Sequence, residues 1–568
     1  MIGVIANQSE RPVAEEFFQL FKTPWEFWQH GRTYDVVIAT TEEVPELDTR
    51  LLLVFGSRIT NIDPRHEVTA GPRVRNAILD FDAGKVPTYG ETLILSAISS
   101  VTRVSTEHGS AGLLLRSSDL QVLRLGYDLF QEIQYLLLVG QPIDNAQFPT
   151  IDIHIAMLRE WIVDADVTLI EIPPTPSERS FIVCLTHDID FAGIRQHKFD
   201  HTMWGFLYRS TAGALLSFAR GRLSFGRMLA SFRAAVSLPL VYLGLARDFW
   251  LPFDWYMRVE KNLPATYYLI PFKGRSGEKL NVAYPDRRAC AYDIGEIAEW
   301  TSKLTREGYE LGVHGIDAWH SVVLGKEELK RIQAIAGNSE IGIRMHWLLR
   351  DEDTYRALED AGYAYDSTAG YNETAGYRNG TVQVFRPLGC EVLLELPMHI
   401  QDGALFFPKR LNLSESAAWE LCESLIGNAK SFGGVLTILW HDRSHGPERF
   451  WGDYYTRLVH KLASLGVWFG TAAQIVAWFR KRREVRFRRV DTPNAGVSLE
   501  AYCPSGKIIP PLTVRVHRPR GFRDTRDEST ASIRRFVDCP WSGDTDLELG
   551  PLLARVSGSV ALSQSLPH

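Results

Sequence analysis

Four segments of the sequence end an apolar run with a carboxylate or an imidazole. The first reads Thr-His-Asp-Ile-Asp and places Asp188 and Asp190 two residues apart, where a buried strand is about to finish. The other three end in His314, His346 and His441. The carboxyl ends of parallel strands in one barrel meet at one mouth. The sequence therefore predicts a single site built from side chains that lie far apart along the chain.

These residue types suit a divalent metal such as zinc, because carboxylate oxygens and imidazole nitrogens are its common ligands. A second carboxylate beside the metal could take a proton from bound water, which is the design of a metal-dependent hydrolase. Each residue alone has a plainer interpretation, as a helix cap or a hydrogen-bonded core histidine. Because several strand ends carry such residues, the catalytic interpretation is favoured.

Alternating strands and helices between residues 180 and 480 must position these groups. Asp293 can cap a helix that carries Ile297 and Leu304 on one side and that Gly308 can end, and a strand-like run follows directly. Similar units repeat along this region, which predicts a parallel sheet closed into a distorted (β/α) barrel.

The flanking regions follow different patterns. Residues 1–172 contain three buried strand-like runs with helical segments between some of them, which predicts a small α/β domain. A connector rich in proline and serine leads into the barrel. Residues 485–555 indicate a small β-rich appendage, and residues 556–568 are expected to form a disordered tail.

Composition limits the classes of partner and compartment. The net charge is −6 and the pI is near 6.3, so the chain has no basic field of the kind that nucleic-acid binding needs. Its six cysteines are scattered without a close pair, which favours free thiols in a reducing compartment. We find no secretory leader and no membrane-spanning run, so we expect a cytoplasmic protein, soluble or peripheral to the inner face of a membrane.

The motifs between residues 180 and 480 resemble those of the polysaccharide deacetylase, or NodB-homology, family. The family's Thr-Phe-Asp-Asp motif is similar to Thr-His-Asp-Ile-Asp here, which implies Asp188 as general base and Asp190 as metal ligand. The family's His-x-x-x-His motif keeps His314, but Ala318 stands where the second imidazole is expected. The resemblance leaves the third ligand open, and the candidates are His320 and His346.

Two further motifs of the family imply the remaining roles. Its Arg-x-Pro-aromatic motif looks like Arg344 to Trp347, with Arg344 keeping the base ionised and oriented. Its Leu-His pair looks like the segment ending in His441, which implies a general acid. The orienting carboxylate for this histidine is Asp402 or Asp442. The candidates for stacking on sugar faces are Trp319, Trp347 and Trp440.

The resemblance implies a metal-dependent hydrolase, with zinc as the expected metal. Its reaction would remove N-acetyl groups from an amino sugar during surface polysaccharide biosynthesis. The sugar substrate could be carried on a lipid. The alternative is a catalytically silent glycan-binding or polysaccharide-assembly protein that kept the barrel and lost the second motif's histidine. A hydrolase for another C–N bond, such as a cyclic amide, is a third hypothesis, because a fold does not fix its substrate.

A basic helical insertion is predicted at about 202–246, directly after the first motif. No acidic residue occurs between Asp200 and Asp248, whereas this stretch and its edge contain several arginines: Arg209, Arg220, Arg222, Arg227, Arg233 and Arg247. One hypothesis is that basic amphipathic helices lie on an anionic membrane. The other is that a helical pair simply packs on the barrel.

Overall fold

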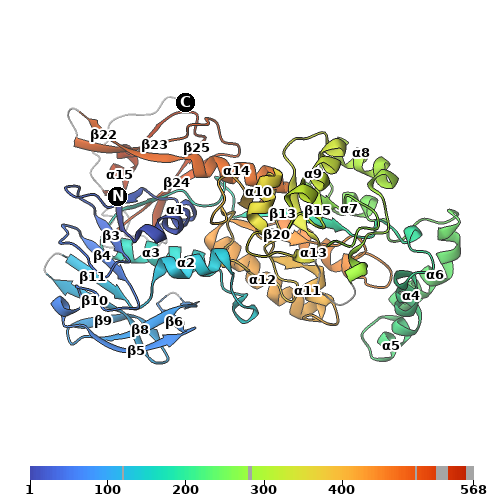
Figure 1. Cartoon of the computed structure of the whole chain (residues 1–568), viewed down its shortest axis with the longest axis horizontal. Coiled ribbons are helices and arrows are strands. Elements are labelled where there is room, and N and C mark those ends of the chain that lie inside the picture. The colour runs from blue at the N-terminus through green and yellow to red at the C-terminus, as the bar shows by residue number, and fades with distance from the viewer. Residues whose placement is uncertain (83, 118–119, 279–284, 493–495, 520–534, 558–568) are drawn as a thin grey trace, which may run out of the picture.

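The computed structural model describes residues 1–568 apart from 83, 118–119, 279–284, 493–495, 520–534 and 558–568. Figure 1 shows an elongated molecule in which the N-terminal strands lie at one end and the barrel occupies the middle. A group of helices projects at the opposite end. The tail expected over 556–568 lies outside the described residues from position 558 onward.

The barrel is one curled sheet in which every pairing is parallel. The strand order is β18-β17-β16-β15-β14-β13-β20-β19, and β21 pairs separately with β13. The predicted distorted (β/α) barrel is thereby confirmed. Its strands are β13 (Ile182–Ile189), β14 (Ala265–Leu269), β15 (Glu310–Gly315), β16 (Gly342–Met345), β17 (Tyr365–Asp366), β18 (Leu394–Glu395), β19 (Ile400–Gln401), β20 (Val435–Leu439) and β21 (Trp468–Phe469).

Helices cover the outside of the barrel sheet and begin and end where the sequence signals them. Asp293 caps a single 3-10 turn that leads into α8, and α10 ends at Gly362, whose φ of 94° suits glycine. Apolar side chains of these helices pack on alternate strand residues such as Val183, Leu311 and Ile343. The helices are α8 (Ala298–Arg306), α9 (Val322–Ala336), α10 (Thr354–Ala361), α12 (Glu415–Phe432) and α13 (Trp451–Ala463). Helix α14 (Ala472–Glu484) instead packs with Ile182 and Cys184, which point to the other face of the sheet.

The N-terminal region forms a nine-stranded mixed sheet of order β2-β1-β3-β4-β11-β10-β9-β6-β7. Its first five strands are parallel and the rest are antiparallel. The strands are β1 (Ile2–Ile5), β2 (Trp25–Phe27), β3 (Val36–Ala39), β4 (Leu51–Phe55), β6 (Ile78–Phe81), β7 (Gly84–Pro87), β9 (Ser100–Thr106), β10 (Gly109–Ser117) and β11 (Leu120–Leu125). A separate ribbon pairs β5 (Thr69–Arg75) with β8 (Glu91–Ser96). Helices α1 (Arg11–Leu20), α2 (Leu129–Leu138) and α3 (Thr150–Asp164) complete the region.

The C-terminal segment returns to the N-terminal region. Strand β12 (Leu169–Glu171) pairs with β24 (Leu512–His517), which also pairs with β25 (Phe536–Trp541). A second small sheet contains β22 (Arg486–Thr492), β23 (Gly496–Tyr502) and β26 (Leu547–Glu548), beside α15 (Gly550–Ser557). Where these parts meet, the buried Arg482 of α14 donates to the carbonyls of Leu20 and Ile172. One guanidinium thus joins the N-terminal region, the connector and the last barrel helix.

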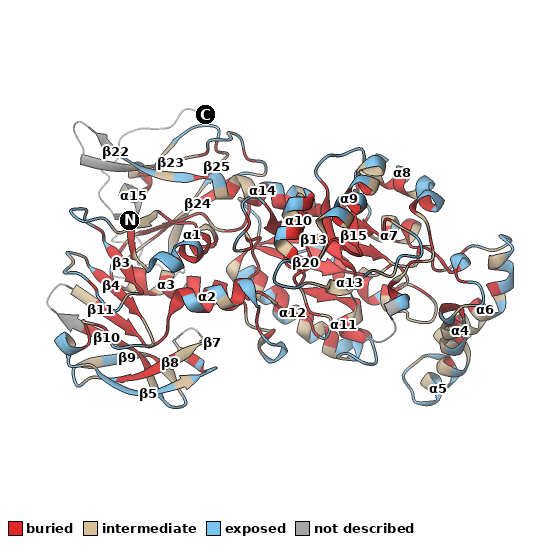
Figure 2. Cartoon of the chain, in the orientation of Figure 1, coloured by how far each residue is buried: buried red, intermediate tan, exposed pale blue. Residues whose placement is uncertain are grey.

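The segment predicted as a helical insertion is helical and projects from the barrel (Figures 1 and 2). Its elements are α4 (His201–Tyr208), a π-helical turn (Arg209–Gly213), α5 (Ala214–Ala219) and α6 (Phe225–Tyr242), after which α7 (Phe253–Val259) rejoins the barrel. We call residues 201–242 the arm. It packs around a small core of its own that includes Phe206, Leu238 and Trp250. In the described part of the chain, every helix is too short or too polar to cross a bilayer.

Candidate metal centre and active site

Strand β13 delivers the first two carboxylates because its side chains alternate between the two faces of the sheet. Thr186 and Asp188 point to one side, where both contact Arg344. His187 points to the other side, and its Nε2 lies 2.7 Å from the Glu260 carboxylate. Asp190 follows just beyond the end of the strand. The alternation therefore directs Asp188 into the site and His187, the residue before it, into the packing on the other face of the sheet.

Asp190, His314 and His346 form a three-residue cluster with ligand atoms all within 4.8 Å of one another. Oδ1 of Asp190 lies 3.3 Å from Nε2 of His314 and 3.6 Å from Nε2 of His346. The Nδ1 atom of His314 lies 2.9 Å from the carbonyl oxygen of Arg344, to which it donates. This contact leaves the Nε2 lone pair of His314 facing the Asp190 carboxylate.

Two lone pairs facing each other at 3.3 Å are unfavourable unless a cation lies between them. Oδ1 of Asp190 is buried without a hydrogen-bond partner, and so is Nδ1 of His346. A donor set of one carboxylate and two imidazoles, with one imidazole held by a backbone carbonyl, is the pattern of catalytic zinc sites. The residues present therefore fit a divalent metal such as zinc.

The protonation states of the cluster agree with metal binding. Burial acts to raise the pKa of Asp190, but His346 and His314 outweigh it and hold the pKa of this carboxyl well below its usual range. Burial lowers the pKa of His346 to about 3, with partial opposition from Asp190. At neutral pH the cluster therefore offers an ionised carboxylate and a neutral imidazole, the forms in which both bind metals.

Asp188 lies beside this cluster and is held by Arg344. Nη1 of Arg344 donates to Oδ1 of Asp188 at 3.0 Å, and Oδ2 of the same carboxylate lies 3.7 Å from Nε2 of His314. The guanidinium is fully buried and also donates to Thr186 and Ser367. A guanidinium fixed by several acceptors holds the neighbouring carboxylate in one position.

His441 reaches the same mouth from the end of β20. Its Nδ1 lies 2.5 Å from Oδ1 of Asp402, and its backbone N–H donates to the other oxygen of that carboxylate. Burial would lower the pKa of His441, but Asp402 outweighs it and raises this pKa to about 9. Asp442, the other candidate for orienting this imidazole, instead accepts from the backbone N–H groups of Phe191 and Ala192.

The remaining sequence candidates occupy different places. His320 is not part of the three-residue cluster, and its Nε2 lies 3.2 Å from the Asp317 carboxylate. Trp440 is fully buried and stacks on Tyr454, so it has no free face for a sugar ring. Trp319 and Trp347 are half-exposed.

Trp347 is the aromatic candidate nearest to the cluster. It follows His346 directly in the chain, and the two rings lie 5.8 Å apart. Its backbone has a φ of 65°, in the left-handed region that residues other than glycine rarely adopt. Such backbone strain is concentrated at functional sites.

Three supporting residues were not foreseen from the sequence. Ser444 donates to Asp402, while Ser367 and Thr186 hold Arg344. Thr186 carried a usable signal, because it lies two residues before Asp188 and must share its face. Ser444 and Ser367 lie outside the regular strands, where no periodic pattern in the sequence predicts their contacts.

Comparison of structures finds carbohydrate deacetylases among the similar proteins. Agd3, a carbohydrate deacetylase, has 10% identity and a TM-score of 0.37, and the match covers 97% of this chain and 98% of Agd3. The polysaccharide deacetylase Bc1974 from Bacillus cereus has 12% identity and a TM-score of 0.24, over 51% of this chain and 91% of that one. PuuE allantoinase has 13% identity and a TM-score of 0.33, over 54% of this chain and 92% of its own.

No protein-family model matches the chain, and no curated protein matches it. With identities of 10 to 13% and TM-scores below 0.4 for these three proteins, the function of this chain has to be inferred from its own side chains.

Proposed function

We propose that this protein is a metal-dependent hydrolase that removes N-acetyl groups from an amino sugar. The observation that carries the proposal is the convergence of five side chains at the carboxyl ends of β13, β15, β16 and β20, four of five consecutive strands in the barrel sheet. These side chains are Asp188, Asp190, His314, His346 and His441. They combine a metal-ligand set, a charged carboxylate and a protonated imidazole. Together these groups can support metal-assisted hydrolysis of an amide.

Asp190, His314 and His346 would hold the metal, which when bound would supply Lewis-acid chemistry and lower the pKa of water. Asp188 would accept a proton from the attacking water, and the hydrogen bond from Arg344 holds it in position. His441 is placed to donate a proton to the departing nitrogen, since Asp402 keeps it protonated. Asp402 and Arg344 act as positioning residues, because they work through these two neighbours.

The substrate and its setting are part of the same proposal. The half-exposed Trp347, next to His346, offers an aromatic face where a sugar ring could stack. We propose an acetylated amino sugar of surface polysaccharide biosynthesis, carried on a lipid and processed in the cytoplasm. The arm described below supports a position at a membrane surface.

Metal analysis together with acetate release tests the proposal. We expect the purified chain to bind about one zinc ion and to release acetate from N-acetylated sugar oligomers. Asp188→Asn should abolish acetate release and retain the metal. The matched control is Asp360→Asn, on an exposed position of α10, which should change neither property.

Two other results would each replace the proposal. Glycan affinity without acetate release would identify a catalytically silent glycan-binding protein. Release of product from a cyclic amide, with no action on acetylated sugars, would identify the alternative C–N hydrolase.

The arm carries an exposed apolar stripe on α6. Phe225, Leu229, Val236 and Leu240 of α6, and the C-cap residue Leu243 that follows it, are spaced by three, four and seven residues, which places them along one face. Val236 is 78% exposed and Leu243 is 71% exposed, which is unusual for large apolar side chains at helical spacing. Figure 2 shows that much of the outer surface of these helices is exposed.

Basic side chains accompany this stripe. Arg220, Arg222 and Arg233 are exposed, and the arm itself contains no acidic residue, although the whole chain has a net charge of −6. An apolar face edged by arginines complements an anionic lipid surface. We propose that the arm holds the enzyme on such a surface and so brings it to lipid-linked substrates.

Vesicle flotation tests the arm. Vesicles that contain anionic lipid should bind the wild type, whereas Val236→Ser/Leu243→Ser and Arg220→Gln/Arg222→Gln/Arg233→Gln should each bind at least about tenfold less. The control Val323→Ser changes an exposed apolar residue on α9, away from the arm. Equal binding of wild type and arm variants would overturn the proposal and favour a purely structural helical pair.

A further inference from the structure

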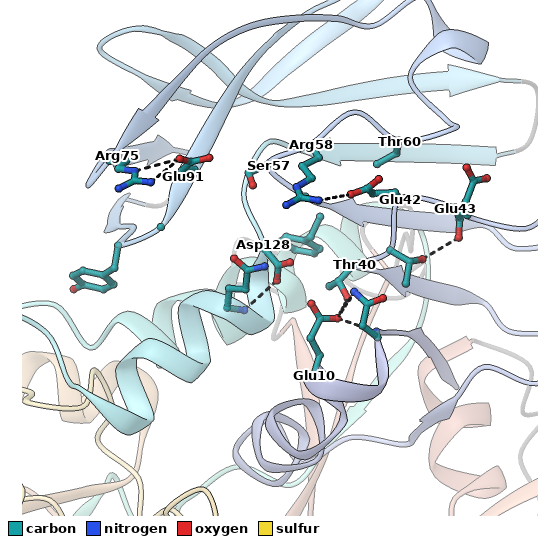
Figure 3. Close-up of a pocket in the computed structure, with 17 residues that line it drawn as sticks. Glu10, Thr40, Glu42, Glu43, Ser57, Arg58, Thr60, Arg75, Glu91 and Asp128 are labelled. Carbon is teal, nitrogen blue, oxygen red and sulfur yellow. Dashed lines mark hydrogen bonds and ion pairs between the residues drawn. The ribbon is translucent and has the colours of Figure 1, made fainter. Parts of the chain in front are cut away.

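A second concave site lies at the carboxyl ends of the parallel strands in the N-terminal sheet (Figure 3). Its lining begins with Asn7 after β1, Thr40 after β3, Gly56 after β4 and Asp128 after β11. Its volume is about 940 Å³, which is in the range of small-molecule sites and much larger than a single ion needs. Crevices at this edge of open parallel sheets are where such folds bind ligands.

The lining of this cavity has an excess of negative charge. It contains five carboxylates and two arginines, and the arginines are already paired, Arg58 with Glu42 at 3.1 Å and Arg75 with Glu91 at 2.8 Å. The three other lining carboxylates, those of Glu10, Glu43 and Asp128, have no basic partner among the described lining residues. A cation in the cavity would be stabilised by these three groups.

Glu10 and Asp128 are the most buried of these acids, at 7% and 8% exposure. Glu10 accepts from the backbone N–H of Asn7 and from the Thr40 hydroxyl, while Asp128 caps α2 by accepting from the backbone N–H of Gln131. Both helix starts beside the cavity are thus already complemented by negative charge. An anionic ligand would be repelled here.

The negative charge of Glu10 also acts on Asp128. Burial, together with the negative charge of Glu10, raises the pKa of Asp128 to about 7. A carboxyl with this pKa has no compensating positive charge beside it, because a paired carboxylate would be shifted the other way.

Hydroxyl groups supply a second, independent indication of a ligand. Thr60 lines the cavity and is only 3% exposed, yet its Oγ1 atom has no hydrogen-bond partner. Buried polar atoms are nearly always satisfied, so this atom points to a group that binds there. Thr40, Thr41 and Ser57 add three more hydroxyls to the lining. A hydroxyl-rich ligand would find several partners.

We propose that this cavity binds a hydroxyl-rich ligand, one or two sugar units in size, that carries a protonated amine. The amine would lie between Glu10 and Asp128, and hydroxyls of the ligand would reach Thr60 and Ser57. An amino sugar freed of its acetyl group belongs to this class, and that link alone rests on the proposed function. The charge and shape of the cavity do not depend on the metal centre.

Calorimetric titration of the full chain at neutral pH and low salt tests the proposal. The probes are a glucosamine dimer, its fully N-acetylated form and cellobiose, and a His314→Ala background weakens binding at the barrel. We expect the glucosamine dimer to bind at least about tenfold more tightly than the two uncharged probes, as a charge-assisted contact would require.

Variants locate the binding. Asp128→Asn keeps a good helix cap, because asparagine caps as well as aspartate, and it should weaken amine binding at least about tenfold. Glu10→Gln should do the same, and Thr60→Val should weaken it a few-fold. Glu107→Gln, an exposed acid outside the cavity, should change nothing.

The proposal is overturned if cellobiose binds as tightly as the glucosamine dimer, if Asp128→Asn binds like the parent, or if no probe binds to the folded chain. Failure of this proposal and of the proposed function can be told apart. Asp188→Asn should lose acetate release and keep amine binding in the cavity, whereas Asp128→Asn should keep acetate release.

Discussion

The carboxyl ends of the parallel strands form one edge in the barrel and another in the N-terminal sheet, and these two edges are built alike but differ in their chemistry. At each edge, polar side chains follow the ends of neighbouring strands, and a fully buried arginine behind them pairs with an aspartate. In the barrel this arginine is Arg344, 3.0 Å from Asp188, and in the N-terminal sheet it is Arg124, 2.7 Å from Asp63. The barrel edge gathers imidazoles beside carboxylates, whereas the described lining of the N-terminal cavity contains no histidine.

This difference shows that backbone topology provides the meeting point and that side-chain type decides the chemistry. Imidazoles beside carboxylates can hold a metal and move protons near neutral pH. Carboxylates beside hydroxyls are suited to attract and orient a cation. The same geometry therefore supports a proposed reaction at one edge and proposed recognition at the other.

The largest expected difference between the edges follows from removing an imidazole. His314→Ala should lower acetate release by at least about a thousandfold, because both the metal and the water it activates would be lost. Binding of an amine in the N-terminal cavity should be unchanged. Steady-state acetate release and zinc content measure the first effect, and calorimetry measures the second. Activity that survives without zinc would refute the metal centre.

The next effect concerns the buried arginine of the N-terminal edge. Asp63→Asn would leave Arg124 buried without a counter-charge, and we expect the free energy of unfolding to fall by about 3 kcal/mol. Arg124 also donates to the carbonyls of Gly56 and Arg58, so the loop that lines the cavity should loosen. Urea unfolding measures the stability. Glu42→Gln, which breaks an exposed ion pair, should cost less than about 1 kcal/mol.

A smaller effect tests the proton donor of the barrel edge. Asp402→Asn should lower kcat by about a hundredfold and move the alkaline limb of the pH profile to lower pH. The carboxylate of Asp402 raises the pKa of His441 to about 9, so the protonated imidazole is present below that pH and is lost above it. Without this carboxylate the loss occurs at lower pH. An unmoved alkaline limb would assign it to another group.

The smallest predicted effect is a dependence of stability on pH at the N-terminal edge. The pKa of Asp128 in the folded chain is raised to about 7, so its contribution to stability is fully present below about pH 4, the pKa of an unfolded aspartate, and is lost as the pH rises toward 7. The free energy of unfolding of the wild type should therefore fall relative to that of Asp128→Asn as the pH rises over this range. Parallel urea titrations at several pH values measure this difference, and identical pH dependence would contradict it.

The sequence predicts the barrel edge well because strand ends are marked by their composition. The choice between His320 and His346 needed the strand register, which pairs His314 with Arg344 and places His346 two residues further on the same face. Spacing along the chain does not contain this information. The same is true of Asp402, which reaches His441 through the pairing of β19 with β20.

The N-terminal edge was not foreseen. Three of its parallel strands were predicted, but the antiparallel strands after β4 range from exposed to buried and show no regular alternation. Strand β5, for example, is exposed along almost its whole length. Its cavity also combines ordinary acids and hydroxyls at spacings that match no motif. Such a site becomes visible only when the strands are assembled.

The buried guanidinium of Arg482 has a practical consequence for anyone who dissects this chain. A fragment limited to residues 180–480 would end before Arg482. A longer fragment that keeps Arg482 would leave its guanidinium without the carbonyl acceptors of Leu20 and Ile172. Removing the C-terminal strands would also leave β12 without β24, its only partner among the described strands. Expression trials should therefore begin with the uncut polypeptide, and a soluble excised catalytic segment would require redesign of this junction.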